Sequence, residues 1–135
     1  MIEFQLDGSC GVPTYLQLVQ QVRHAMRLGL LQPGDQLPTA REVVARLAIN
    51  PNTVLRAYRE LEREGLVGAR PGQGTFVLRT LVGTDARAQA GLRRDLDRWL
   101  RAARVAGLDQ EGIDALYRAA VRDSVLGRPG AEGVA

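Results

Sequence analysis

The sequence of 135 residues is long enough for one domain, or for a small domain with a short appendage. Its net charge of +3 is mild. Its single cysteine, Cys10, excludes an intrachain disulfide, and no Cys/His cluster could hold a structural zinc ion. No segment has the length and hydrophobicity of a membrane span or a secretory leader, so we expect a cytoplasmic protein with no membrane partner.

The first forty residues predict a short strand, a helix and a turn. Apolar and polar side chains alternate over residues 2–6, which predicts a half-buried strand. Pro13 suits the first position of a helix, and apolar residues recur at helical spacing up to Gly29. Pro33 and Gly34 then predict a tight turn, because proline restricts the backbone and glycine frees it.

Two short helices are predicted next. Thr39 and Glu42 have the Thr-x-x-Glu spacing of a capping box, which predicts a helix that ends near Ala48. Asn50 is a good helix cap, and Pro51 fits the first position of a third helix, where its missing N–H costs nothing. Helical spacing places Val54, Tyr58 and Leu61 on the buried face of that helix. Two short helices joined by a turn of a few residues predict a helix-turn-helix.

A β-hairpin is predicted directly after these helices. Short apolar runs over residues 66–70 and 75–78 flank a turn rich in proline and glycine. A hairpin in this position is the wing of a winged helix-turn-helix. The predicted fold class is therefore α+β, mainly α, with a winged helix-turn-helix over residues 1–80.

The exposed faces of the third helix carry side chains that can contact DNA. Asparagine pairs bidentately with adenine, arginine binds guanine or a phosphate, and threonine or leucine methyl groups can contact thymine. The candidates on this helix are Asn52, Thr53, Arg56 and Arg59. The first three are expected to reach base edges, because early positions of a recognition helix lie deepest in the groove. For Leu55, base contact and ordinary surface exposure both remain open.

Further DNA contacts are expected outside the third helix. Arg41 lies in the first turn of the second helix, where free N–H groups and a positive dipole end attract phosphate. At the wing tip, small residues let the backbone approach phosphate closely. The candidates there are Arg70, Gly72, Gln73 and Gly74.

Four sequence blocks in this order resemble the GntR family of bacterial transcriptional regulators: residues 33–42, 50–54, 57–62 and 72–77. The Asn-Pro-Asn-Thr-Val form of the second block, together with a short two-helix tail, is similar to the YtrA-like branch. The resemblance implies operator contacts from Arg41, Asn50, Asn52, Thr53, Gly72 and Gly74. Many family members carry arginine or another polar residue where Leu55 stands, so no base-reading role is carried over to it.

The remaining chain predicts two more helices and a tail. One helix runs from Asp85 to about Ala106, another is capped by Asp109, and residues 127–135 are expected to be disordered. We assign residues 81–126 to dimerisation or effector binding, although two helices cannot enclose a sizeable ligand pocket alone. The expected homodimer interface contains Leu92, Leu96, Trp99, Ile113 and Leu116. The alternative is that these side chains pack on the winged helix of the same chain.

The sequence predicts a DNA-binding transcriptional regulator and no enzyme. Its only histidine, His24, has no carboxylate at helical spacing, and we expect no metal, cofactor or catalytic residue. A homodimer is expected to bind a pseudo-palindromic operator in double-stranded DNA, and the family resemblance suggests a repressor. Modulation by a small-molecule effector is left open. The alternative function is a protein–protein adaptor that binds no operator, although adaptor faces usually show an apolar patch.

Overall fold

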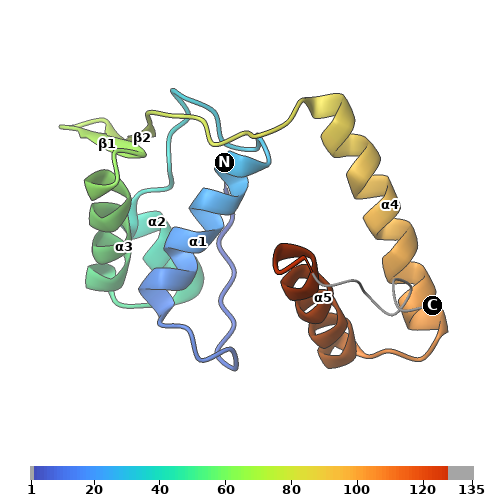
Figure 1. Cartoon of the computed structure of the whole chain (residues 1–135). Helices are drawn as coiled ribbons and strands as arrows, with labels where there is room; N and C mark the ends of the chain where they lie inside the picture. The colour runs from blue at the N-terminus through green and yellow to red at the C-terminus, as the bar shows by residue number, and fades with distance from the viewer. Residues whose placement is uncertain (1, 128–135) are drawn as a thin grey trace. The chain divides into compact units, whose positions relative to one another are not determined.

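The computed structural model describes residues 2–127 and divides into two compact units, Met1–Ala86 and the part from Arg87 on. Each unit is described by itself. Within the described residues, the first unit holds three helices and a two-stranded sheet, and the second holds two helices (Figure 1). The predicted fold class, mainly α with a small β-hairpin, is confirmed. The predicted tail falls, after Gly127, outside the described residues.

The elements follow one another in the predicted order. The helices and strands are α1 (Thr14–Arg27), α2 (Ala40–Leu47), α3 (Pro51–Arg63), β1 (Val67–Arg70), β2 (Gly74–Val77), α4 (Ala86–Val105) and α5 (Gln110–Val125). Thr39 caps α2, Asn50 caps α3 and Asp109 caps α5, each through a side-chain oxygen that accepts a backbone N–H. Pro13 precedes α1 as its N-cap and is not its first residue.

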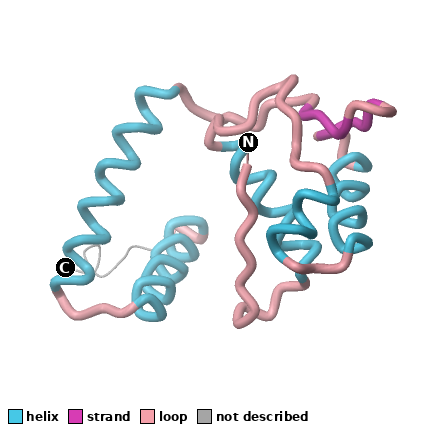
Figure 2. Tube along the Cα trace, turned by 180° about the vertical axis from the view of Figure 1, so that it is seen from behind, coloured by secondary structure: helices cyan, strands magenta, loops and turns pink. Residues whose placement is uncertain are grey.

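The predicted strand at residues 2–6 is wrong. This segment is extended but joins no sheet, as the loop colour in Figure 2 shows. Two glutamine side chains of α1 take the place of a partner strand. Gln21 accepts the N–H of Gln5 and donates to its carbonyl oxygen, and Gln17 does the same for Asp7. The alternating pattern still has a physical basis, because Phe4 is buried in the core.

One aliphatic core joins α1, α2, α3 and the hairpin. The predicted stripe of α3 is confirmed, since Val54, Tyr58 and Leu61 are all buried. The other main members of the core are Phe4, Leu18, Val19, Val22, Met26, Leu31, Leu37, Val43, Ala57, Leu66, Val67 and Val77. Side by side in Figure 1, α1 and α3 are also joined by an ion pair between Arg23 and Glu64.

The hairpin is fixed to the helical core by a third extended segment. The N–H of Leu37 donates to Thr75, that of Val77 to Asp35, and that of Gly34 to Val77. The sequence predicts only a turn around Pro33 and Gly34, and the pairing with β2 was not foreseen. This pairing holds the wing at a defined place after α3.

A buried hydrogen bond ties α3 to the start of α2. The hydroxyl of Tyr58, which is only 7% exposed, donates to the carbonyl oxygen of Pro38. Tyr58→Phe leaves that carbonyl without its partner and is expected to lower the free energy of unfolding by about 1–3 kcal/mol. Chemical denaturation measures the change. The matched control is Tyr117→Phe, at a side chain that is 56% exposed; an equal loss there would contradict the prediction.

The same tyrosine is expected to make the free energy of unfolding fall as the pH rises above about 10. Burial, and secondarily the charge of Glu42, raises the pKa of Tyr58 above its ordinary value of 10.0. The folded protein therefore holds this proton longer than the unfolded chain does. Its contribution to stability is complete below about pH 10 and falls above that value by up to about 1.4 kcal/mol per pH unit. Denaturation curves from pH 9 upward should show this fall in the wild type and a flatter profile in Tyr58→Phe. Parallel profiles would contradict it.

In the second unit, α4 and α5 diverge from the turn at Gly107 (Figure 1). Ala103 and Ile113 are buried near this turn. Four of the five side chains predicted at a dimer interface are exposed: Leu92 (65%), Leu96 (44%), Trp99 (36%) and Leu116 (48%). The fifth, Ile113, is 5% exposed. It is covered within the chain itself, so the interface prediction depends on the other four.

Candidate nucleic-acid interface

The start of α3 is built by its own cap. The Oδ1 atom of Asn50 accepts the N–H of Asn52 at 2.8 Å, and Pro51 occupies the first helical position. Because Oδ1 of Asn50 accepts this bond, the side chain that is predicted to contact DNA also caps the helix. Asn52 is exposed and Thr53 is half-buried beside it. The predicted recognition helix therefore presents its first turn to solvent in a fixed orientation.

The turn between α2 and α3 is short because one residue reverses the chain. Ala48 ends α2 in the left-handed region, with φ of 54°, and its N–H donates to Val44. Thr39 begins α2 by accepting the N–H of Glu42 at 3.1 Å, which is half of the predicted capping box. Arg41 lies exposed in this first turn, where the sequence places it.

A shallow groove joins the beginnings of α1 and α3. Its lining residues are Thr14, Tyr15, Asn50, Asn52, Thr53 and Arg56. The guanidinium of Arg56 lies over the ring of Tyr15, with its Cζ atom 3.8 Å from the ring centroid. Four predicted DNA-contacting residues are thus brought together. Leu55 (41% exposed) and Arg59 are also exposed on α3 but do not line this groove.

Thr14 and Tyr15 were missed by the sequence prediction. A signal was present, because Tyr15 continues the apolar spacing of α1 by one turn before Val19. Spacing alone identifies such an aromatic residue as an extension of the core. Its use as a surface for an arginine depends on α3 lying beside α1, which only the tertiary structure shows.

The groove is free of carboxylates, whereas the other end of α3 is rich in them. Neither α1 nor α3 has an acidic residue in its first turn. Glu60, farther along α3, pairs with Arg63, and Glu64, the C-cap of α3, pairs with Arg23. The hydrogen bond from Arg63, aided by the nearby arginine charges, holds the pKa of Glu60 below its ordinary value. The electrostatic arrangement therefore favours an anion at the N-terminal end of the helix.

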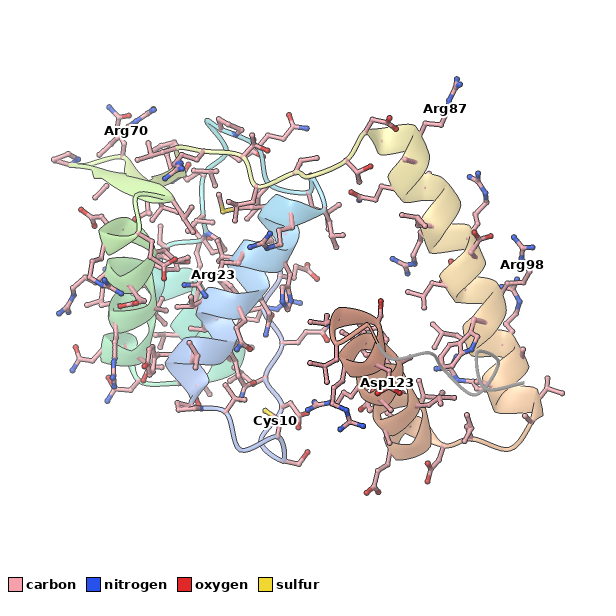
Figure 3. All side chains as sticks on the ribbon, viewed as in Figure 1. Cys10, Arg23, Arg70, Arg87, Arg98 and Asp123 are labelled. Atoms are coloured by element: carbon pink, nitrogen blue, oxygen red, sulfur yellow. The ribbon has the colours of Figure 1, made fainter. Side chains whose placement is uncertain are left out.

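The wing turn brings its four predicted residues to one end of the hairpin. Gln73 donates its N–H to Arg70, and Gly72 between them has φ of 74°, as a type II turn requires. The side chain of Gln36 donates to the carbonyl oxygen of Gln73 at 2.8 Å. Arg70 lies over the ring of Phe76, 4.2 Å from its centroid, at the end of the wing that Figure 3 labels.

Gly74 is required by the wing backbone. Its φ is 126°, and an added Cβ atom would lie 2.5 Å from Nε2 of Gln36. Gly74→Ala is expected to lower the free energy of unfolding by about 1–3 kcal/mol, because this backbone region is nearly restricted to glycine. The control Gly72→Asn should cost less than about 1 kcal/mol, since asparagine tolerates the left-handed region and no atom lies within 4 Å. Denaturant titration compares the two variants. Equal losses in the free energy of unfolding would refute the special requirement for glycine at position 74.

The described residues show no candidate metal site. Between residues 2 and 127, no group of three His, Cys, Asp or Glu side chains could hold a metal ion. His24 lies exposed on α1, and Cys10 is exposed in the loop before it (Figure 3). None of the described helices is both long and apolar enough to cross a membrane.

Three packed helices, a short turn between α2 and α3, and a hairpin after α3 define a winged helix-turn-helix protein. Over 73% of its length, the chain is 36% identical to the uncharacterized HTH-type transcriptional regulator YhcF of Bacillus subtilis, of which the match covers 82%. The model of the family described as "Bacterial regulatory proteins, gntR family" matches residues 14–77. The chain belongs to the GntR family, as its motifs imply.

The resemblance to the YtrA-like branch is also confirmed. The chain is 42% identical to the HTH-type transcriptional repressor YtrA of Bacillus subtilis over 73 residues, which are 54% of this chain and 56% of YtrA. The chain thus spans little more than half of YtrA. The crystal structure of a transcriptional antiterminator from Listeria monocytogenes aligns with a TM-score of 0.56 and 30% identity, over 90% of this chain and 92% of that one.

Proposed function

We propose that this chain is a sequence-specific transcriptional repressor that binds double-stranded operator DNA as a homodimer. The observation that carries the proposal is the groove at the start of α3, where Asn52, Thr53 and Arg56 lie together with no carboxylate between them. Asparagine and arginine are the side chains that read base edges and bind phosphates. The wing offers Arg70 and a backbone turn at Gly72 for the neighbouring groove.

Arg41 and Arg59 extend this surface in the proposal. Both side chains are exposed, and Arg41 lies in the first turn of α2, where phosphate is favoured. Leu55 is exposed by 41% on α3 and is assigned no base contact. We therefore propose that Asn52 and Thr53 read bases, whereas Arg41 and Arg59 bind phosphates.

The second unit supports the dimeric part of the proposal. Leu92, Leu96, Trp99 and Leu116 expose apolar surface on α4 and α5, and a second copy of the chain is the simplest cover for it. A two-fold dimer presents two recognition helices and two wings. It therefore fits a pseudo-palindrome whose half-sites lie roughly one helical turn apart.

The sign of regulation is taken from the relatives. YtrA is named a repressor, and a further relative, 37% identical over 68 residues, is named the arabinose metabolism transcriptional repressor of Geobacillus stearothermophilus. Because these relatives are regulators, neither an adaptor role nor an enzyme activity is favoured. A repressor of this kind works in the bacterial cytoplasm, where its operator lies.

A titration of the full chain with random-sequence duplex DNA tests the proposal. We expect binding at low salt and a linear fall of log K with the logarithm of salt concentration, because bound phosphates release counterions. Selection of bound sequences from the random pool should then yield a pseudo-palindrome. Absence of binding at low salt would favour the adaptor, whereas binding that salt leaves unchanged would contradict the phosphate contacts proposed here.

A further inference from the structure

Two aromatic side chains of the winged-helix unit lie beneath arginines of the candidate DNA surface. The aromatic residues Phe4 and Tyr58 are buried in the core of this unit. Tyr15 and Phe76 are only half-buried, and each has a guanidinium over its ring. We propose that Tyr15 and Phe76 are positioning residues, which hold Arg56 and Arg70 ready to bind two backbone phosphates of one DNA duplex. This inference rests on the proposed DNA-binding function.

The pair in the groove joins two helices. Tyr15 belongs to α1 and Arg56 to α3, and the Cζ atom of Arg56 lies 3.8 Å from the ring centroid. The nearest acid along α3, Glu60, is bound by Arg63. Glu60 attracts Arg56 electrostatically, but none of the ion pairs between described residues involves Arg56, so the ring of Tyr15 is its direct contact.

The pair in the wing is set by the hairpin register. Arg70 is opposite Gly74 and Phe76 is opposite Gly68, so Arg70 and Phe76 are diagonal neighbours on one face. Neither glycine has a side chain to compete for that face. The Cζ atom of Arg70 consequently lies 4.2 Å from the ring centroid of Phe76.

Stacking leaves an arginine free to bind phosphate. The ring contacts the flat face of the guanidinium, while the five N–H donors point outward in its plane. A carboxylate partner would use those same donors. An arginine held by a ring also loses less rotamer freedom when it binds, because part of that freedom is already lost in the free protein.

The groove around Arg56 has the chemistry of a phosphate site. Thr14 and Asn50 add a hydroxyl and an amide group to the guanidinium, and no acidic side chain lines the groove. The ring of Tyr15 holds Arg56 toward α1, away from the other exposed flank of α3, where Leu55 and Arg59 lie. We therefore assign Arg56 to a phosphate and not to a base edge.

A double-mutant cycle on the full chain tests the first pair, with random-sequence duplex DNA as the probe. Tyr15→Leu should weaken binding about two- to fivefold, and Tyr15→Phe, which keeps the ring, should bind as the wild type does. In an Arg56→Gln background, Tyr15→Leu should have no further effect. Arg56→Gln itself should lower the salt slope by about one for each copy of the chain, so by about two for the proposed dimer, equally for all sequences.

The wing pair is tested in the same way with Phe76→Leu and Arg70→Gln. Phe76→Tyr keeps the ring and should preserve binding, even if Phe76→Leu proves unstable by thermal melting. If an aromatic→Leu substitution lowers DNA affinity equally whether or not its arginine is present, the inference is overturned. A loss of preference at one base position in Arg56→Gln would overturn the phosphate assignment. If the wild type binds no duplex, the proposed function itself fails instead.

Discussion

Leu96→Glu is expected to convert the proposed homodimer into a monomer. Leu96 is 44% exposed on α4, in line with Leu92 and Trp99, so the substitution leaves the fold of one chain intact. In a two-fold interface the new carboxylate appears twice, and each copy is buried without a partner. The expected cost is about 3 kcal/mol or more, which is at least roughly a hundredfold in the dimer dissociation constant. Sedimentation velocity measures the change.

Val105→Glu is the matched control for this prediction. Val105 is 90% exposed and lies nine residues after Leu96, on the opposite side of α4. It should leave the dimer unchanged. A fragment ending at Leu81, which lacks α4 and α5, should sediment as a monomer, as Leu96→Glu should. A dimeric Leu96→Glu variant, or a fragment that dimerises as well as the full chain, would show that α4 and α5 are not the interface.

Asn52→Ala is expected to relax operator preference at one base position of each half-site. The side chain is exposed in the first turn of α3, where a recognition helix reaches most deeply, and its loss should not affect folding. The bidentate contact of an asparagine with adenine is worth about 1–3 kcal/mol of discrimination. Selection from a random duplex pool, followed by titration of the selected operator, measures both the affinity and the altered position.

Two control variants distinguish a base contact of Asn52 from a phosphate contact or an indirect effect. Arg41→Ala should weaken binding to all sequences alike, because a phosphate contact carries no sequence information. Glu62→Ala, near the other end of α3, should change neither affinity nor preference. A uniform loss for Asn52→Ala, without a change at any position, would assign Asn52 to the backbone of the DNA.

Local signals explain why most elements were predictable. Helix caps act within three residues, so the Thr39 and Asn50 side chains accept the N–H groups that their spacing predicts. The apolar stripe of α3 was equally clear, because burial on one helix face repeats with the helical period. The wing followed from Pro71 and Gly72, whose backbone preferences match the turn that the structure contains.

Apart from the one-residue shift at Pro13, the failures have a common cause, since each concerns a partner distant in the sequence. Alternation over residues 2–6 indicates an extended, half-buried segment, but whether such a segment joins a sheet depends on what lies beside it. Here the amides of Gln17 and Gln21 satisfy its backbone in place of a strand. The predicted dimer interface stays a prediction, and within it Ile113 is only 5% exposed in the single chain.

The sequence by itself determined the order of the helices, most of their boundaries, the wing and the family, because caps, turns and motifs operate between near neighbours. Only the tertiary structure decided which of the predicted side chains share a groove. It placed Tyr15 of α1 under Arg56 of α3, and it paired residues 34–37 with β2. Such contacts depend on how the helices and strands pack, and a pattern within a single element contains no information about its neighbour.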